Sequence, residues 1–495
     1  MKQQIISMKQ GVARMPAWRM RKPVDFEMLA DEHIAIVGPN GSGKSMLVDM
    51  LTGRHPLLGN SIAYNFAPSR QERPSDNIKC LTFHDYYGGD NDHNYYLQQR
   101  WNQQEISEET STTGTALEEA YLMAGEDTLE RRQLQEHLYE LFHLNALLDK
   151  YIILLSSGEL RKFQLTKALL SHPRVLIMDN PFIGLDAETR DQLRQLLAIL
   201  SRENALQVIL VLSKTDDIPE FITHIVEVND MAVKAKTSRQ AYLSSRPKQL
   251  IPPLLSPEKA SLILQLPAGK DDFHCKEVIK INNISIRYGQ RTILKDLTWN
   301  VRNGEHWALS GPNGAGKSTL ISLVCADNPQ SYACDIALFG IPRGSGESIW
   351  SIKKHIGYVS PEMHRAYQRD LPAIKIVASG LKDSIGLYVK PTEEELEKCR
   401  FWMHLFGLDG LEEQTFLKLS SGQQRLVLLA RAFVKDPELL ILDEPLHGLD
   451  DRNRQIVKEI IDTFCLRKNK TLLMVTHYAE ELPTCIDHHL HLRRH

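Results

Sequence analysis

Two short glycine-rich stretches contain the residue types that hold phosphate groups. Residues 311–318 read GPNGAGKS, and they follow the apolar run at 307–309 and precede a helix-like run. This is the G-x-x-x-x-G-K-[ST] pattern in its strand–loop–helix setting, where backbone N–H groups point at phosphate oxygens. Lys317 supplies a charge for the β- and γ-phosphates, and the Ser318 hydroxyl can hold Mg²⁺. Residues 38–45 read GPNGSGKS in the same setting, so the chain predicts two such sites.

An acidic pair and a histidine in the second half have the types needed for hydrolysis. The apolar run Leu439–Leu442 leads into Asp443 and then Glu444. Asp443 can hold Mg²⁺ through water, and Glu444 is placed to accept a proton from an attacking water. His477 ends the next apolar run. A lone histidine among nineteen is usually unremarkable, but its place at a strand end favours a functional role.

The first half lacks two of these groups. Asp179 is followed by Asn180, which cannot act as a base, and Lys214 stands where the second half has His477. The phosphate-loop sequence of this half is nevertheless intact. The pattern predicts a nucleotide-holding site that hydrolyses poorly.

The two halves are an internal repeat. Lys44 and Lys317 are 273 positions apart (317 minus 44). Three further pairs of segments match at an offset of 264 (419 minus 155), namely LSSGE at 155–159 with LSSGQ at 419–423, VLIMD at 175–179 with LLILD at 439–443, and GLD at 184–186 with GLD at 448–450. The same order in both halves indicates a duplicated domain.

The repeat sets the expected organisation of the chain. We expect one domain at 1–245, a second at 277–495, and between them, at 246–276, a proline-rich semi-rigid linker. The apolar spacing within 129–149 predicts an amphipathic helix before the first LSSGE segment.

Together these motifs resemble the ATP-binding-cassette (ABC) ATPases, and each half resembles one complete cassette. The resemblance implies an α/β fold, with two P-loop NTPase cassettes in tandem, each a mixed sheet core with a helical subdomain. It implies Mg²⁺-dependent ATP hydrolysis, with ATP and Mg²⁺ as ligands. The segments at 344–350 and 352–359 resemble, more narrowly, the twin-cassette proteins of the ModF type, which are associated with molybdate transport.

The resemblance also implies the roles of individual residues. Glu444 and His477 would be catalytic, His477 as the switch histidine, and Mg²⁺ would be held by Ser45, Asp179, Ser318 and Asp443. The residues expected to bind ATP are Gly38, Asn40, Gly41, Gly43, Lys44, Ser45, Ser156, Ser157, Gly158 and Asp179 in the first half, and Tyr288, Gly311, Asn313, Gly314, Gly316, Lys317, Ser318, Thr319, Ser420, Ser421, Gly422 and Asp443 in the second.

Tyr288 is where the family places an aromatic ring that stacks on adenine, an interaction worth roughly 1–3 kcal/mol per base. The equivalent in the first half is Met15, and Trp18 is an alternative if the register slips, although a tryptophan in the core is an equal expectation. The family's switch glutamine is missing, since Glu362 and His84 stand near its two positions. Its loss argues against ordinary coupling to a membrane partner.

Family members bind each ATP between the phosphate loop of one cassette and the LSSG serine and glycine of another. The complete site would therefore join two sets of residues: Lys317, Ser318, Asp443, Glu444 and His477 of the second half, and Ser156, Ser157 and Gly158 of the first. The poorer site would join Lys44, Ser45 and Asp179 of the first half to Ser420, Ser421 and Gly422 of the second. Tethering favours pairing within one chain, and head-to-tail pairing of two chains is the alternative.

Composition narrows the function classes. The formal net charge of −3 gives no reason to expect a nucleic-acid partner. No signal-peptide core or membrane-spanning run is visible, so we expect a cytoplasmic protein or one peripheral to the inner face of the membrane. The seven cysteines have no C-x-x-C spacing and suggest neither a zinc site nor disulfides. The polar, aromatic stretch 85–109 fits a surface insertion or, alternatively, a docking surface.

Three functions fit this sequence. The first is the cytosolic ATPase of a transporter whose membrane-spanning subunits are on another chain. The second is a soluble twin-cassette ATPase that acts on ribosomes or other nucleic-acid machinery, and the third is a molybdate-responsive regulator that transports nothing. The short proline-rich linker, and Asn180 in place of a glutamate in the first half, argue against the second function.

Overall fold

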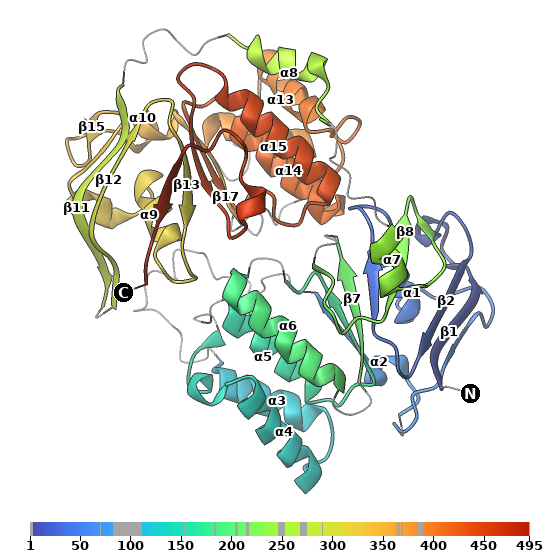
Figure 1. The fold of residues 1–495 in the computed structure, drawn as a ribbon. Coiled ribbons are helices and arrows are strands. Elements are labelled where there is room, and N and C mark those ends of the chain that lie inside the picture. The colour runs from blue at the N-terminus through green and yellow to red at the C-terminus, as the bar shows by residue number, and fades with distance from the viewer. Residues whose placement is uncertain are drawn as a thin grey trace. The chain divides into compact units, whose positions relative to one another are not determined.

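The chain divides into two units, Met1–Lys248 and Gln249–His495 (Figure 1). The computed structural model describes residues 3–69, 71–82, 111–152, 155, 157–182, 185–202, 206–213, 217–245, 253–267, 275–289, 291–361, 363, 367, 370–383 and 390–494. Within these residues no helix has both the length and the apolar character needed to cross a membrane.

The first unit is built on a core sheet and a small antiparallel sheet. The core sheet has the strand order β10-β8-β3-β7-β6-β5 with β9 beside β8, and its strands from β8 to β5 run parallel. Its members are β3 (Ile34–Val37), β5 (Ile78–Thr82), β6 (Val175–Asp179), β7 (Gln207–Leu212), β8 (His224–Asn229), β9 (Ala232–Val233) and β10 (Thr237–Ser238). The antiparallel sheet contains β1 (Gln4–Gly11), β2 (Val24–Leu29) and β4 (Ile62–Tyr64).

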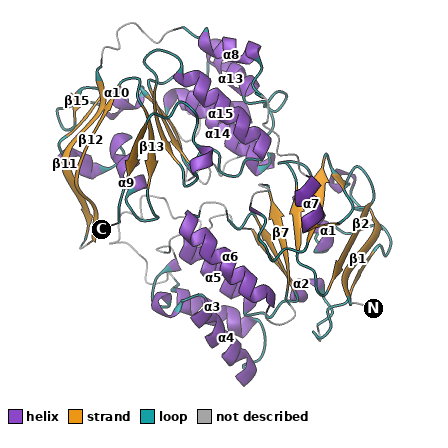
Figure 2. Ribbon diagram, viewed as in Figure 1, coloured by secondary structure: helices purple, strands orange, loops and turns teal. Residues whose placement is uncertain are grey.

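Helices cover the core sheet of this unit because its strands are apolar on both faces. Ile34 and Ile36 pack with the antiparallel sheet and α1, whereas Ala35 and Val37 pack with the helices α3 to α6. The helices are α1 (Lys44–Leu51), α2 (Pro74–Asn77), α3 (Thr113–Met123), α4 (Leu129–Leu141), α5 (Ser157–Leu169), α6 (Ala187–Arg202) and α7 (Arg239–Ser245), with 3-10 turns η1 (Pro16–Trp18) and η4 (Asn145–Leu147). Figure 2 shows α3 to α6 gathered beside the sheet.

The helix expected at 129–149 is shorter in the structure. α4 ends at Leu141, and His143 follows with a φ of 53°, which an α-helix cannot contain. The chain then makes only the turn η4 before the first LSSGE segment.

The second unit repeats this plan. Its parallel sheet has the order β16-β17-β18-β13-β19, and its antiparallel sheet the order β12-β11-β14-β15. The strands are β11 (Glu277–Tyr288), β12 (Arg291–Arg302), β13 (His306–Ser310), β14 (Ile336–Leu338), β15 (Ile341–Pro342), β16 (Ile356–Val359), β17 (Leu439–Asp443), β18 (Thr471–Val475) and β19 (His488–His491). The helices are α8 (Pro257–Leu264), α9 (Lys317–Val324), α10 (Ile349–Lys353), α12 (Ala373–Ser379), α13 (Glu393–Leu405), α14 (Ser421–Phe433) and α15 (Asp451–Cys465), with turns η7 (Pro329–Ala333), η8 (Gly380–Lys382), η9 (Phe416–Lys418) and η10 (Ala479–Glu481).

The two faces of this parallel sheet are buried in different clusters. Leu439 and Ile441 pack toward α9 and the antiparallel sheet, whereas Leu440 and Leu442 pack toward α12 to α15. Figure 2 shows α9 between the two sheets and α14 and α15 on the other side of the parallel one. The prediction of α/β cassettes in tandem is therefore confirmed.

Much of the segment expected to be a linker packs on the second unit. Ile263 of α8 is fully buried in the cluster that includes α13 to α15. The backbone N–H groups of Leu254 and Leu255 both donate to the Glu459 carboxylate, at 2.9 and 2.6 Å. Ser256 caps α8 by accepting from Lys259 N. The proline-rich segment therefore contains a short capped helix with a buried apolar side, which the prediction of a linker did not include.

Candidate functional site

Each unit contains a curled loop between its central strand and the helix that follows. In the second unit Lys317 begins α9, and its Nζ donates to the carbonyls of Gly311 and Pro312 at 2.7 and 3.0 Å. Gly316 caps the helix with a φ of 93°, and a Cβ there would lie 2.7 Å from Leu294. Only glycine fits this combination of left-handed backbone and close packing.

The first unit has the same loop. Lys44 begins α1, and its Nζ donates to the carbonyls of Gly38 and Pro39 at 2.7 and 2.9 Å. Gly43 caps the helix with a φ of 103°. The expected phosphate-binding residues of the two units lie in these loops and helix starts: Gly38, Asn40, Gly41, Gly43, Lys44 and Ser45, and Gly311, Asn313, Gly314, Gly316, Lys317, Ser318 and Thr319.

The sheet order brings the other expected residues of the second unit to the same edge. β17 ends at Asp443, β18 ends two residues before His477, and β18 lies between β17 and β13 in a parallel register. The carboxyl ends of parallel strands meet at one edge, where ligands of such folds bind. In the first unit β6 delivers Asp179 to the equivalent edge.

Glu444 is held on both of its carboxylate oxygens. Oε1 lies 3.2 Å from His477 Nε2 and Oε2 lies 3.3 Å from His447 Nδ1, and the Glu444 side chain is 17% exposed. Burial pushes the pKa of Glu444 upward, but the hydrogen bonds and charge of His447 and His477 outweigh it and hold the pKa well below its usual range. The carboxylate is therefore ionised at neutral pH and able to accept a proton.

His447 was not identified as a functional residue from the sequence, although comparison of the two repeats could have identified it. The repeat offset of 264 aligns His447 with Ile183, so this imidazole belongs to the half that has the glutamate. Its Nε2 is buried and has no hydrogen-bond partner among the described residues.

Asn180 takes the place of Glu444 in the first unit, and its side chain is hydrogen-bonded at the ends of β6 and β7. Its Nδ2 donates to Asp179 Oδ1 at 2.8 Å, and its Oδ1 accepts from Ser213 N at 2.9 Å. A side-chain amide has no proton-accepting function at neutral pH. This strand end can hold a metal ligand but offers no general base at Asn180.

A buried arginine fixes the turn that carries Glu444. From α14, Arg425 donates to the backbone carbonyls of Asp443 and Glu444 at 2.8 and 2.5 Å. Burial lowers the pKa of Arg425 to about 10, so it stays charged at neutral pH. Arg425 Nε also donates to Pro445 O at 3.3 Å, and the corresponding residue of the first unit, Arg161, donates from Nη1 to Pro181 O at 2.6 Å. Sequence reasoning missed both arginines.

The LSSG segments stand at helix starts. Ser420 caps α14, with a capping box in which Ser420 Oγ accepts from Gln423 N and Gln423 Oε1 accepts from Ser420 N. Ser421 and Gly422 occupy the first turn, whose free N–H groups suit an anion. In the first unit α5 begins at Ser157, and Gly158 is packed so closely that a Cβ would lie 2.7 Å from Thr189.

The residues considered for stacking on adenine have different surroundings in the two units. Tyr288 ends β11, is half-buried, and its hydroxyl accepts from Asn328 Nδ2 at 2.9 Å. In the first unit Met15 is 47% exposed. Trp18 stacks on His55, with ring centroids 4.0 Å apart.

Some residues for which the sequence made predictions lie outside the described part of the structure. They are His84, the stretch 85–109, Ser156, Gly184, Lys214 and Glu362. The backbone of Ser157 is described, but its side chain is not.

The loops fit the phosphates of ATP and its Mg²⁺. Each lysine already bonds loop carbonyls, each loop has glycine where a side chain would collide, and a serine and an aspartate supply the oxygen ligands that Mg²⁺ prefers. This geometry defines P-loop ATPase cassettes.

Comparison with known proteins shows which family these cassettes represent. The sequence model described as "ABC transporter" matches residues 21–183 and 294–447, and the chain belongs to this family. It is an ATP-binding component with two cassettes, and membership implies ATP hydrolysis and binding of ATP with Mg²⁺.

Several relatives align along nearly the whole chain, including the following two. "ABC transporter ATP-binding protein ModF" of Escherichia coli is 38% identical over 97% of this chain and 95% of that protein. An uncharacterized ABC transporter ATP-binding protein of Schizosaccharomyces pombe is 29% identical over 97% of this chain and 95% of that protein. The solved structure titled "RNase-L Inhibitor" shares the fold, with a TM-score of 0.51 and 17% identity over 92% of this chain and 82% of that one.

Proposed function

We propose that this protein is the ATP-hydrolysing subunit of a transporter whose membrane-spanning parts are separate chains, and that it works at the cytoplasmic face of the membrane. The observation that carries the catalytic part is the contrast between the carboxylate of Glu444, held by two imidazoles, and the amide of Asn180, which bonds Asp179 and Ser213. Membership of the ABC transporter family supports the transport part.

Each residue of the second unit has a role in this proposal. Ser318 and Asp443 would hold Mg²⁺, which would supply positive charge next to the phosphates, and Lys317 would bind the phosphate oxygens. Glu444 accepts a proton from the attacking water. His477 and His447 keep Glu444 ionised and fixed in direction.

The hydrolytic site is completed by the LSSG segment of the other cassette. The N–H groups of Ser157 and Gly158, at the start of α5, bind the γ-phosphate held by Lys317. The second pairing joins Lys44 to Ser421 and Gly422 and holds ATP without rapid turnover. Because the cassettes are tethered, both pairings form within one chain.

Closure by ATP can be measured on the intact chain. Small-angle scattering of Glu444→Gln with Mg²⁺ and ATP should show compaction of the monomer, since each nucleotide joins both cassettes. Lys44→Ala combined with Lys317→Ala is the control and should not compact. Compaction that appears only as dimerisation would count against pairing within one chain.

We also propose a connection to molybdate transport, which rests on the likeness to one relative. Identity of 38% to ModF along nearly the whole chain supports it, together with the resemblance at 344–359. The test is affinity capture of the Glu444→Gln chain from native membranes, with molybdate uptake measured in cells that carry it. A co-purifying membrane subunit and lowered uptake are expected. Ribosomes in the captured material, with uptake unchanged, would favour the soluble machinery instead.

A further inference from the structure

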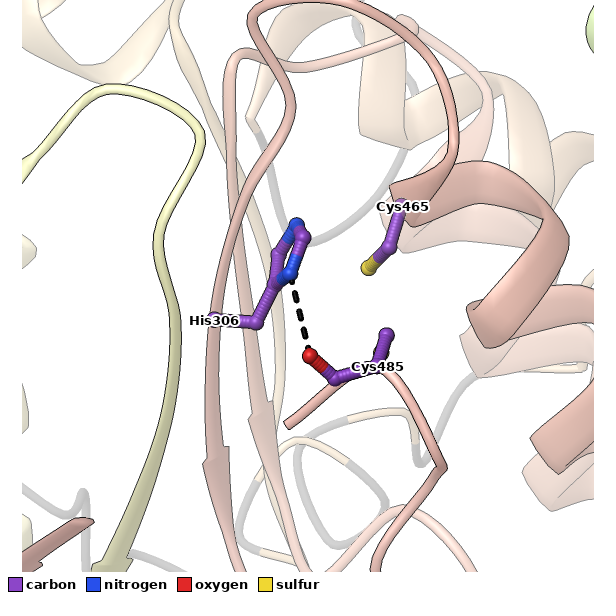
Figure 3. Close-up of side chains that lie close together, drawn as sticks. All are labelled: His306, Cys465 and Cys485. Carbon is purple, nitrogen blue, oxygen red and sulfur yellow. Dashed lines mark hydrogen bonds between the residues drawn. The ribbon is translucent and has the colours of Figure 1, made fainter. Parts of the chain in front are cut away.

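Three metal-ligating side chains meet in the second unit, away from the nucleotide residues. His306 begins β13, Cys465 ends α15, and Cys485 lies between η10 and β19. One ligand atom from each lies within 4.8 Å of the others (Figure 3). His306 is at the amino end of β13, whereas the phosphate loop follows the carboxyl end, so this cluster is at the opposite edge of the sheet.

The separation of these atoms is close to that of a metal site. A tetrahedral zinc ion with bonds of about 2.3 Å to sulfur and about 2.0 Å to nitrogen sets its ligand atoms roughly 3.5–3.8 Å apart. The three ligand atoms would therefore reach the separation found in a zinc site if they moved about 1 Å closer together. Two thiols and an imidazole select soft or borderline ions such as Zn²⁺ over Mg²⁺ or Ca²⁺. Cys465 is buried, and Cys485 is half-buried.

Two backbone carbonyls hold the imidazole ring of His306. His306 Nδ1 lies 3.1 Å from the Cys485 carbonyl and Nε2 lies 3.1 Å from the Lys470 carbonyl. A neutral imidazole donates from only one nitrogen, so the other nitrogen directs its lone pair at a carbonyl oxygen and has to turn away from it before it can bind an ion. A ligating histidine commonly donates its second N–H to a backbone carbonyl, which fixes the ring.

Two carboxylates add negative charge next to the triad. Asp487 Oδ1 accepts from His306 N at 2.9 Å, and its Oδ2 lies 3.9 Å from His306 Nδ1. Asp462 Oδ1 accepts from Cys485 N at 2.8 Å. These contacts hold the backbone of two ligands, and the carboxylates favour a bound cation.

The repeat provides an internal comparison. The offsets align His306 with His33 and Asp487 with Thr223, and both units pair these residues through their backbones: Asp487 N donates to His306 O at 3.1 Å, and Thr223 N donates to His33 O at 2.9 Å. The cysteines are absent there.

In the first unit the positions of Cys465 and Cys485 hold Ser201 and Phe221. The His33 ring contacts the edge of Phe221, with centroids 5.8 Å apart, and its Nδ1 accepts from Val208 N at 3.2 Å. The same histidine is thus used for packing in one unit, so the cassette fold does not require thiols at these positions.

We propose that His306, Cys465 and Cys485 bind one soft divalent cation of the zinc type, with water as the fourth ligand. Binding displaces one proton from each thiol, so affinity rises with pH. The ion joins the end of α15 and the segment before β19 to β13, and it stabilises the second unit without taking part in hydrolysis.

Cobalt and zinc titration of the reduced full-length chain tests this site. Co²⁺ should bind once per chain with a thiolate-to-cobalt charge-transfer band, and Zn²⁺ should displace it and raise the melting temperature. The charge-transfer band should be lost in Cys465→Ser combined with Cys485→Ser. It should be unchanged in Cys334→Ser, a half-buried cysteine of the same unit.

The wild-type titration keeps the proposal testable even if the double variant folds poorly. A reduced wild-type chain that shows no thiolate–cobalt band would overturn it. So would a band that survives in the folded double variant, or a Cys465–Cys485 disulfide in chain purified anaerobically with zinc present.

Discussion

Asn180 and Glu444 occupy the same backbone turn at the ends of equivalent strands. Their φ angles are 47° and 49°, in the left-handed region. The N–H of each donates at 2.8 Å to the equivalent carbonyl on the neighbouring strand, Val211 or Val475. Of these two residues, Glu444 is the one with a carboxylate, and that carboxylate contacts His447 and His477. The two cassettes therefore differ here in chemistry and not in backbone.

Replacing Glu444 by Gln should lower steady-state ATP hydrolysis by roughly 10²–10⁴-fold, the usual scale for losing a positioned base. ATP binding should survive because Lys317, Ser318 and Asp443 remain. Nucleotide binding and turnover measured on the same preparation check this. The control, Asn180→Asp, should stay within a few-fold of wild type, and near-normal turnover in Glu444→Gln would show that another group is the base.

Removing His447 should change the pH dependence of hydrolysis. Its hydrogen bond lowers the pKa of Glu444 while burial raises it, so His447→Ala should raise that pKa. The carboxylate then takes up a proton at a higher pH, and the acid limb of the kcat–pH profile should move to higher pH. His404→Ala, at an exposed histidine of the same unit, is the control. An unmoved acid limb in His447→Ala would exclude this role.

The fold could be predicted from sequence because its signals are local. Phosphate loops, apolar strands and a repeated order were enough to predict two tandem α/β cassettes. The roles of Arg425 and His447 could not be read locally, because they depend on which way a side chain points after helix and sheet pack. α8 was hidden by the prolines around it, although Ser256 and Pro257 form a standard helix start. The His306 cluster draws its ligands from three distant elements, so no spacing motif could reveal it.

The packing of α8 predicts that substitutions at two adjacent residues lower the free energy of unfolding by different amounts. Ile263 is fully buried, and Ile263→Ala should lower the free energy of unfolding by about 2–5 kcal/mol. Leu262 is 41% exposed, and Leu262→Ala should change the free energy by about 0.5 kcal/mol or less. Denaturant titration checks both values. Equal effects would mean that α8 does not pack on the second unit.

Arg425 should matter for both folding and catalysis. Arg425→Met leaves the buried or part-buried carbonyls of the Asp443–Pro445 turn without this donor, which should cost about 1–3 kcal/mol of stability. It should also slow hydrolysis, since the turn that aims Glu444 is no longer fixed. Calorimetry and turnover should be compared with Arg452→Met, an exposed position of α15. Wild-type values in Arg425→Met would contradict the assignment.

The central claim is that one cassette hydrolyses ATP while the other only holds it. The most direct measurement is a single-turnover quench, in which the chain is loaded with Mg²⁺ and radiolabelled ATP at both sites and bound nucleotide is analysed over time. We predict that one of the two bound ATP molecules becomes ADP while the other remains ATP, and that both remain ATP in Glu444→Gln. Conversion of both molecules at similar rates in the wild-type chain would contradict the claim.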